Sequence, residues 1–235
     1  MVGPQHKTSE PERSPIRERL IDAAIAVLRA DGPGAMKVRR ISDEAGASTM
    51  AVYHHFGDLQ SLLGQVVVRG YSMLRAELLD AAISNTDPDV QLFSMALCVR
   101  GMAQRNPHLY DLMFGLSIRG TYRAAASTSA NEARRHFRDA YAVLVHACES
   151  LVSSGRVDAD DGEQIAAQLW SLVHGFVALE AAGHFDDYGD TVVEILAPMA
   201  VNHMVGFGED RTHAAQSANT ALQWWESRNR STFQA

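Results

Sequence analysis

The stretch that decides the fold is residues 38–63, which read VRRISDEAGASTMAVYHHFGDLQSLL. Apolar residues in its first part, among them Ile41 and Ala45, recur at helical spacing, so one face of a short helix can pack inward. Gly46 can adopt the positive φ that a tight turn between two helices requires. Ser48 then stands at the N-cap of the next helix, where its hydroxyl can accept a hydrogen bond from a free amide.

Two short helices joined by a tight turn form a helix-turn-helix, whose second helix enters the major groove of double-stranded DNA. Residues 49–56 are the second helix in this interpretation, because they follow the turn and end in a cluster of aromatic and histidine side chains. Asp58 can cap a longer helix that begins just beyond them. The pattern therefore predicts a small DNA-reading unit.

The residues of this unit resemble the DNA-binding signature of the TetR family of bacterial transcriptional repressors. The match consists of AGAS at 45–48, VYHHF at 52–56 and LL at 62–63, all in one register. A weaker resemblance lies in NPHLYDLMFG at 106–115 and WSLVHGF at 170–176, which are similar to one C-terminal type in this family, with a Trp-x-x-x-His-Gly signature. It implies an all-helical domain that binds a small ligand and dimerises.

The resemblance also implies which residues contact DNA. Thr49 and its two neighbours occupy the first turn of the recognition helix, where the family contacts base edges. Tyr53 and His54 sit where the family contacts phosphates. The predicted DNA-binding residues are Lys37, Arg39, Ser48, Thr49, Met50, Ala51, Tyr53, His54 and His55.

Chemistry supports some of these assignments and leaves others open. Arg39 could donate two hydrogen bonds to guanine, and Met50 offers an apolar contact to a thymine methyl. Tyr53 could instead pack its ring on the three-helix core, although its hydroxyl would still need a polar partner. Val52 and Phe56 are expected in the core.

Two residues depart from the family pattern in a way that weakens DNA binding. Leu59 stands where the family often has a phosphate-binding lysine, and Ala51 stands where a longer side chain often contacts the backbone. Phosphate neutralisation supplies much of the nonspecific affinity, so compensation is expected from Lys37, Arg40 or the upstream arginines. Those upstream residues are Arg13, Arg17 and Arg19, for which a merely solvated face is the alternative.

Charge and composition agree with a DNA-binding chain only when the sequence is divided. The net charge is -7 over 235 residues, yet residues 1–60 hold eight basic and eight acidic side chains. The acidic balance therefore belongs to the later part, which phosphates would repel. No apolar run reaches the roughly 18 residues of a membrane span. Cys98 and Cys148 lie in apolar helical patterns and are expected to be buried free thiols in a reducing cytoplasm.

The remaining chain predicts helices and no sheet, so the fold class is all-α. Proline follows a capping residue at Ser14-Pro15, Asp87-Pro88 and Asn106-Pro107, which marks three helix starts. Further helices are predicted to end at Gly155 and to span about 160–182 and 191–205, with a possible kink at Pro198. The expected organisation is a flexible extension (1–14), a helix-turn-helix head (15–62), a ligand-binding and dimerisation bundle (63–207) and a tail (208–235) in which a short helix docks Trp224 and Trp225.

The predicted effector site lies on the helices that carry the second resemblance. Trp170 and His174 are four residues apart and share a helical face. The predicted ligand-binding residues are Met102, Met113, Phe114, Trp170, His174 and Phe176. Aromatic and methionine side chains at helical spacing more often belong to a core, and that alternative stays open. A dimer face is expected at Leu169, Leu172, Val173, Val177, Val193, Leu196 and Met204.

The function predicted from these patterns is that of a cytoplasmic homodimeric repressor. It would bind a palindromic operator in double-stranded DNA and leave it when a small apolar or amphipathic effector binds. The alternative is a helical interaction protein with a TetR-like head and attenuated DNA binding. An enzyme is disfavoured because the sequence has no H-E-x-x-H, G-x-S-x-G or glycine-rich phosphate loop. Neither a cofactor nor a metal is expected, since His54 and His55 point in different directions from one helix.

Overall fold

The structure is a computed structural model that describes residues 14–115 and 128–232. These residues form α-helices and contain no strand, which confirms the all-α prediction. The helices are α1 (Pro15–Asp31), α2 (Val38–Glu44), α3 (Thr49–Phe56), α4 (Leu59–Ser84), α5 (Pro88–Arg105), α6 (Pro107–Phe114), α7 (Thr128–Ser153), α8 (Gly162–Ala181), α9 (Ala197–Gly206) and α10 (Arg211–Thr232). None of them is long and apolar enough to cross a membrane.

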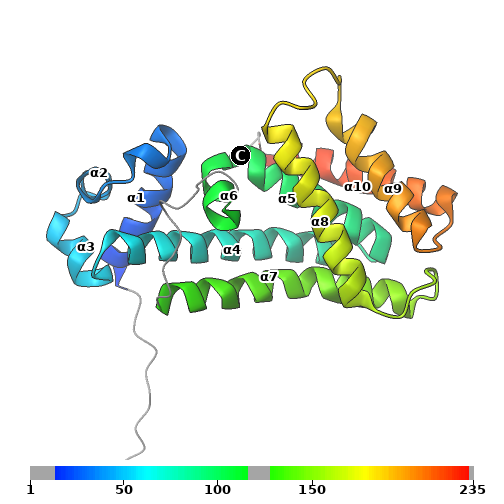
Figure 1. The fold of residues 1–235 in the computed structure, drawn as a ribbon, viewed down its shortest axis with the longest axis horizontal. Helices are drawn as coiled ribbons and strands as arrows, with labels where there is room; N and C mark the ends of the chain where they lie inside the picture. The colour runs from blue at the N-terminus through cyan, green and yellow to red at the C-terminus, as the bar shows by residue number, and fades with distance from the viewer. Residues whose placement is uncertain (1–13, 116–127, 233–235) are drawn as a thin grey trace, which may run out of the picture.

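The first three helices form a head at one end of the long helix α4 (Figure 1). Its core includes Leu20 and Val27 of α1, Ile41 of α2 and Val52 of α3, all of which are fully buried. Gly46 has a φ of +59°, so the turn between α2 and α3 is of the predicted kind. The head thus has its own small apolar core. The side of α3 opposite this core faces outward.

The body is a helical bundle built along α4. The long helices α4 and α7 lie side by side, and α5 and α8 pack against them (Figure 1). Side-chain caps form at two of the predicted helix starts, whereas Ser14 and Asn106 stand before their helices without a capping hydrogen bond. Asp58 accepts a hydrogen bond from the amide of Ser61 at 2.7 Å, and Asp87 accepts one from the amide of Asp89 at 2.9 Å.

A π-helical turn, η2 (Val192–Leu196), precedes α9 and explains the irregularity expected at Pro198. Proline has no amide hydrogen, so it cannot donate to the carbonyl four residues earlier, that of Glu194. The backbone relaxes into a wider turn instead of a simple kink.

The expected dimer face is mostly wrong in its residues. Five of the seven side chains are buried within the protomer: Leu169, Val173, Val177, Leu196 and Met204. They face inward because α8 and α9 turn their apolar sides toward the bundle core. Val193 is 54 % exposed and Leu172 is half-buried, while Leu179, which was not predicted, is 46 % exposed.

The C-terminal helix α10 has 22 residues and is longer than the short helix expected there. It packs on α5 and α9, and the ring of Trp225 lies over Gly101 of α5. A Cβ at Gly101 would come within 2.4 Å of that ring, so the glycine admits the indole. Arg228 lies over both Trp224 and Trp225, at 5.5 and 5.8 Å from the ring centroids. The expected extension at 1–14 falls, apart from Ser14, outside the described residues.

Candidate DNA interface and effector cavity

The outward side of α3 carries the residues predicted to read DNA. Thr49, Met50, Tyr53 and His54 are exposed, and the exposed fractions of Met50 and Tyr53 are 69 % and 50 %. Val52, on the opposite side of the helix, is fully buried. The large exposed apolar surface of Met50 and Tyr53 is unusual for a solvated helix and fits a face that meets another molecule.

Three other predicted residues have a different environment. Ser48 occupies the N-cap of α3 with an extended backbone, but its hydroxyl makes no capping bond, contrary to expectation. The serine is exposed, so its hydroxyl can turn to solvent or to a bound phosphate instead of the helix amides. Ala51 and His55 are half-buried, and Ala51 packs against the core.

The basic side chains near this face differ in their environment: two are exposed, and one is paired with carboxylates of the head. Lys37 and Arg39 are exposed, and Lys37 provides no side-chain cap for α2. Arg40 pairs with Glu44 at 2.8 Å and with Asp31 at 3.0 Å. Its hydrogen bonds to Glu44 and then to Asp31 raise the pKa of this guanidinium. Arg40 is therefore engaged within the head, which makes it a poor substitute for a missing phosphate contact.

The upstream arginines hold the head together. Arg19 donates to the carbonyl oxygens of Ala45 and Gly46, at 3.0 and 3.3 Å, and so ties α1 to the turn before the recognition helix. Arg17 lies over the ring of Phe56, 5.2 Å from its centroid. Neither is simply a solvated charge. Arg13 lies outside the described residues.

Leu59 is the first residue of α4, directly after the cap Asp58. Its side chain is half-buried and packs against the apolar core. The leucine therefore has a packing role at the position where the resemblance implies a phosphate-binding lysine.

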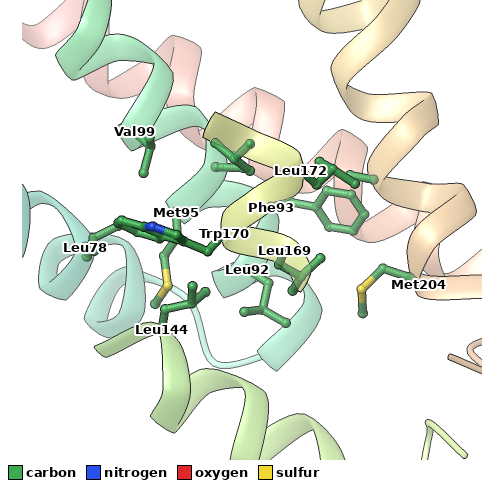
Figure 2. A pocket seen from close by; sticks show the side chains of 13 residues that line it. Leu78, Leu92, Phe93, Met95, Val99, Leu144, Leu169, Trp170, Leu172 and Met204 are labelled. Carbon is green, nitrogen blue, oxygen red and sulfur yellow. The ribbon is translucent and has the colours of Figure 1, made fainter. Parts of the chain in front are cut away.

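The body contains an apolar cavity between α4, α5, α7, α8 and α9 (Figure 2). Its volume is about 30 Å³. The cavity is narrow, and a ligand of ordinary size would have to push side chains aside. It is lined by Leu78, Leu92, Phe93, Met95, Ala96, Val99, Leu144, Leu169, Trp170, Leu172, Val173, Ala200 and Met204.

Of the six predicted effector residues, Trp170 lies on the wall of this cavity. Met102, Met113 and Phe176 are buried elsewhere in the core, where Phe176 stacks on Phe185. The sequence analysis assigned four other lining residues to a dimer face: Leu169, Leu172, Val173 and Met204. It did not predict Leu92 or Leu144 as ligand contacts, because their helical spacing is the same as that of any core residue.

An aromatic cluster adjoins the cavity through the ring of Trp170. His174 lies one helical turn further along α8, with its ring centroid 4.2 Å from that of Trp170. Its Nδ1 is 2.5 Å from the hydroxyl of Tyr110 on α6. Burial lowers the pKa of His174 to about 4 and raises the pKa of Tyr110. The further members of the cluster are Tyr71, Phe114, Phe137 and Tyr141.

The Nε2 atom of His174 is buried and has no hydrogen-bond partner among the described residues. If the more acidic phenol of Tyr110 donates to Nδ1, then Nε2 carries the proton of the neutral imidazole. A buried donor without a partner is rare in proteins.

Helix α6 connects this cluster to the head. Arg29 of α1 donates to the side-chain oxygen of Asn106, the residue that begins α6, at 2.9 Å. Near the other end of α6, the carbonyl of Met113 accepts a hydrogen bond from Tyr71 of α4 at 2.8 Å. Movement of α6 would thus be felt at both α1 and α4.

A cluster of polar side chains in the body contains residues of the types that bind metal ions. Asp87, Asp89 and His213 have ligand atoms within 4.8 Å of one another. Nη1 of Arg156 lies 2.9 Å from Asp87 Oδ2 and 3.0 Å from His213 Nε2. The guanidinium thus provides the positive charge among these side chains, which ties the α7–α8 loop to the starts of α5 and α10.

Two family models cover most of the described chain. Residues 20–66 match the model "Bacterial regulatory proteins, tetR family", and residues 92–204 match "Tetracyclin repressor-like, C-terminal domain". The chain belongs to the TetR family. It is a DNA-binding transcriptional regulator, as the helix-turn-helix pattern predicted, and neither the family nor the similar proteins below are described as enzymes.

Similar proteins include HTH-type transcriptional regulators of Mycobacterium tuberculosis. The transcriptional regulator Rv0681 of Mycobacterium tuberculosis is 23% identical over 205 residues, which cover 86% of each chain. The repressor KstR of the same organism is 29% identical over 97 residues, or 41% of this chain and 44% of KstR.

Solved structures share the fold. A protein of unknown function from Rhodococcus sp. RHA1 superposes with a TM-score of 0.70 at 23% identity, covering 86% of this chain and 100% of that one. RolR in complex with resorcinol gives a TM-score of 0.59 at 15% identity, covering 88% and 94%.

Proposed function

We propose that this TetR-family regulator is a homodimeric repressor that leaves its operator when a small apolar or amphipathic molecule binds the body. The observation that supports this most directly is the arrangement of the exposed α3 face, the apolar cavity and the α6 contacts between them. A cytoplasmic location follows from action on chromosomal DNA.

The DNA step would use α3 in the major groove. Thr49 and Met50 would meet base edges, Tyr53 and His54 would meet the backbone, and Arg39 would reach a guanine or a phosphate. Lys37, Ser48, Ala51 and His55 complete the proposed contact surface around them. One helix of this length reads few bases, so specificity requires a second copy on a second half-site.

The proposed homodimer is supported by exposed apolar side chains near the end of α8. Leu179, Tyr188 and Val193 are 46 %, 49 % and 54 % exposed, although large apolar groups are usually covered. A two-fold dimer would place the same surface of each protomer against the other, and thereby match a palindromic operator.

The effector step would begin in the cavity. A ligand that enters it must displace Trp170 or its neighbours, because little free space is present. Trp170 contacts Phe114 and His174, which in turn contact Tyr110 of α6. A shift of α6 would move α1 and change the separation of the two heads. The ligand can bias this equilibrium only by its different affinities for the two states. Proteins of the same fold support such a role, since RolR has been solved with resorcinol bound.

A genomic-fragment selection with the full-length protein tests the proposal. The expected result is enrichment of a discrete palindrome by the wild type and loss of that enrichment in Tyr53→Ala. Candidate molecules can then be screened for release of the selected fragment. Uniform binding to all fragments, or none, would instead favour the alternative that the protein is a helical interaction protein with attenuated DNA binding, to which Leu59 and Ala51 point.

A further inference from the structure

The walls of the effector cavity exclude charge. None of the thirteen side chains that line it is ionisable, and none carries a hydroxyl or an amide. The one polar side-chain atom among them is the indole nitrogen of Trp170, which can donate a hydrogen bond but cannot neutralise an ion. An ion placed among such side chains would lose its hydration without gaining a counter-charge.

The adjoining aromatic cluster provides no charge either. Burial keeps His174 neutral by lowering its pKa to about 4, and it raises the pKa of Tyr71 to about 12. Between pH 5 and 9 these side chains offer a neutral imidazole and neutral phenols. They can form hydrogen bonds to a ligand, but they cannot act as its ionic partners.

The arginine nearest in sequence to the lining residues is already paired. Arg100 follows Val99 on α5, but its guanidinium binds both carboxylate oxygens of Glu180, at distances of 2.8 to 3.0 Å. The same guanidinium lies 3.3 Å from the hydroxyl of Thr191. Drawing Arg100 toward the cavity would leave Glu180 as an unpaired, largely buried carboxylate, which is strongly unfavourable.

We propose that the effector of this regulator is electrically neutral over its buried part. This inference rests on the proposed function, since it names the chemical class that the cavity accepts. Aromatic compounds, esters and long-chain alcohols belong to that class, and free carboxylates, phosphates and ammonium ions do not. A single hydrogen-bond acceptor on the ligand would suit Nε2 of His174 if that atom carries the imidazole proton. Met95 and Met204 in the wall have flexible thioethers that let the cavity adapt to ligand shape.

Two dyes with the same ring skeleton, one neutral and one charged, distinguish the effect of ligand charge on binding from the effect of apolar size. N-phenyl-1-naphthylamine is uncharged, and 1-anilinonaphthalene-8-sulfonate adds one sulfonate to it; both become fluorescent in apolar surroundings. Each would be titrated into the full-length protein at pH 7.5.

Two variants fill the cavity. Ala96→Phe fills the cavity from α5, and Ala200→Leu fills it from α9 if the first variant fails to fold. Ala76→Phe, at an exposed position of α4, is the matched control.

The expected result has two parts. The uncharged amine binds the wild type and Ala76→Phe equally, and at least tenfold more weakly when the cavity is filled. Binding inside the cavity is the binding that the filling substitution removes. By this measure the sulfonate has an affinity for the cavity at least tenfold lower than that of the amine. Sulfonate binding as tight as amine binding, and equally sensitive to Ala96→Phe, would overturn the inference. The inference would also be overturned if both dyes bound equally well to the wild type and to the variant with a filled cavity, or if neither dye bound.

Release of the selected DNA fragment is measured in parallel and reports on the proposed function separately. If the amine enters the cavity but no molecule that competes with it there releases the DNA fragment, the effector role of the cavity fails while its charge preference stands. If the sulfonate binds the cavity as tightly as the amine and releases DNA, the effector role stands and the charge preference is wrong.

Discussion

Arg29, in the last turn of α1, donates to the side-chain oxygen of Asn106 at 2.9 Å, and Asn106 is largely buried at the start of α6. The bond joins the DNA-binding head to the helix that contacts the aromatic cluster. A buried amide that loses its partner is unfavourable, so α1 and α6 tend to move together.

Arg29→Ala should uncouple the two ends of the protein. We expect operator affinity and ligand affinity to remain within about twofold, while the ligand concentration needed to release DNA rises several-fold. Fluorescence anisotropy with labelled operator, titrated with ligand, measures both. Arg134→Ala, at an exposed position of α7, is the control and should behave as the wild type. Identical release curves for wild type and Arg29→Ala would show that coupling does not pass through this bond.

Arg39→Ala and Tyr53→Ala should each weaken operator binding without changing helix content. A good pair of hydrogen bonds to a base contributes about 1–3 kcal/mol of discrimination, so Arg39→Ala should also relax the base preference if it reads guanine. Arg40→Ala is a close control, because that arginine is held by Asp31 and Glu44. Equal loss of affinity on every sequence would make Arg39 a phosphate contact, and no loss in either variant would contradict the assignment.

Leu59→Lys should strengthen binding to operator and nonspecific DNA alike. The lysine stem can cover the apolar patch that Leu59 covers, while its ammonium reaches the DNA backbone. Each added phosphate contact steepens the salt dependence by about one unit. Binding measured between low and moderate salt checks this slope. An unchanged slope would mean that the side chain at this position stays turned toward the core.

His174 should make the fold sensitive to acid. Its pKa is about 4 when folded and 6.5 when exposed, so the unfolded chain binds more protons between these values. The stability that depends on neutral His174 is complete above pH 6.5 and decreases as the pH falls toward 4, by up to about 3 kcal/mol. Melting temperatures at pH 7.5 and 5 should therefore differ less in His174→Phe than in the wild type.

Asp89 acts in the opposite direction over the same range. Burial raises the pKa of this carboxyl to about 6, so the folded state favours its protonated form, and that contribution is lost as the pH rises through 6. Asp89→Asn should therefore enlarge the acid-induced loss of stability, in contrast to His174→Phe. The same change in both variants would contradict the two assignments.

Sequence patterns predicted the fold well where a residue type has one structural use. Gly46 at its turn and the capping aspartates Asp58 and Asp87 occupy the predicted positions. Proline marked the starts of α1, α5 and α6, because proline is accepted at the first helical position and interrupts later ones, although of the residues before these prolines only Asp87 forms a side-chain cap. The buried states of Cys98 and Cys148 also agree with their apolar surroundings.

The cavity and the outer faces of α8 and α9 could not be predicted in the same way. A helix can bury one apolar stripe against its own core and another against a partner, and spacing does not tell which stripe does which. Val193 and Val177 are both valines on apolar faces, yet only Val193 is exposed. Arg19 was ambiguous for a related reason, since the carbonyl groups that it binds lie far along the chain.

The recognition helix, with the sequence TMAVYHHF, contains no lysine or arginine. Proteins that scan a chromosome are retained on it by phosphate neutralisation, and about 10⁶ or more competing sites act together as a sink. A recognition helix without basic side chains adds little to this retention, so the protein stays only briefly at each wrong site. Weaker retention leaves more copies free between encounters, while weaker electrostatic steering slows their return to the DNA.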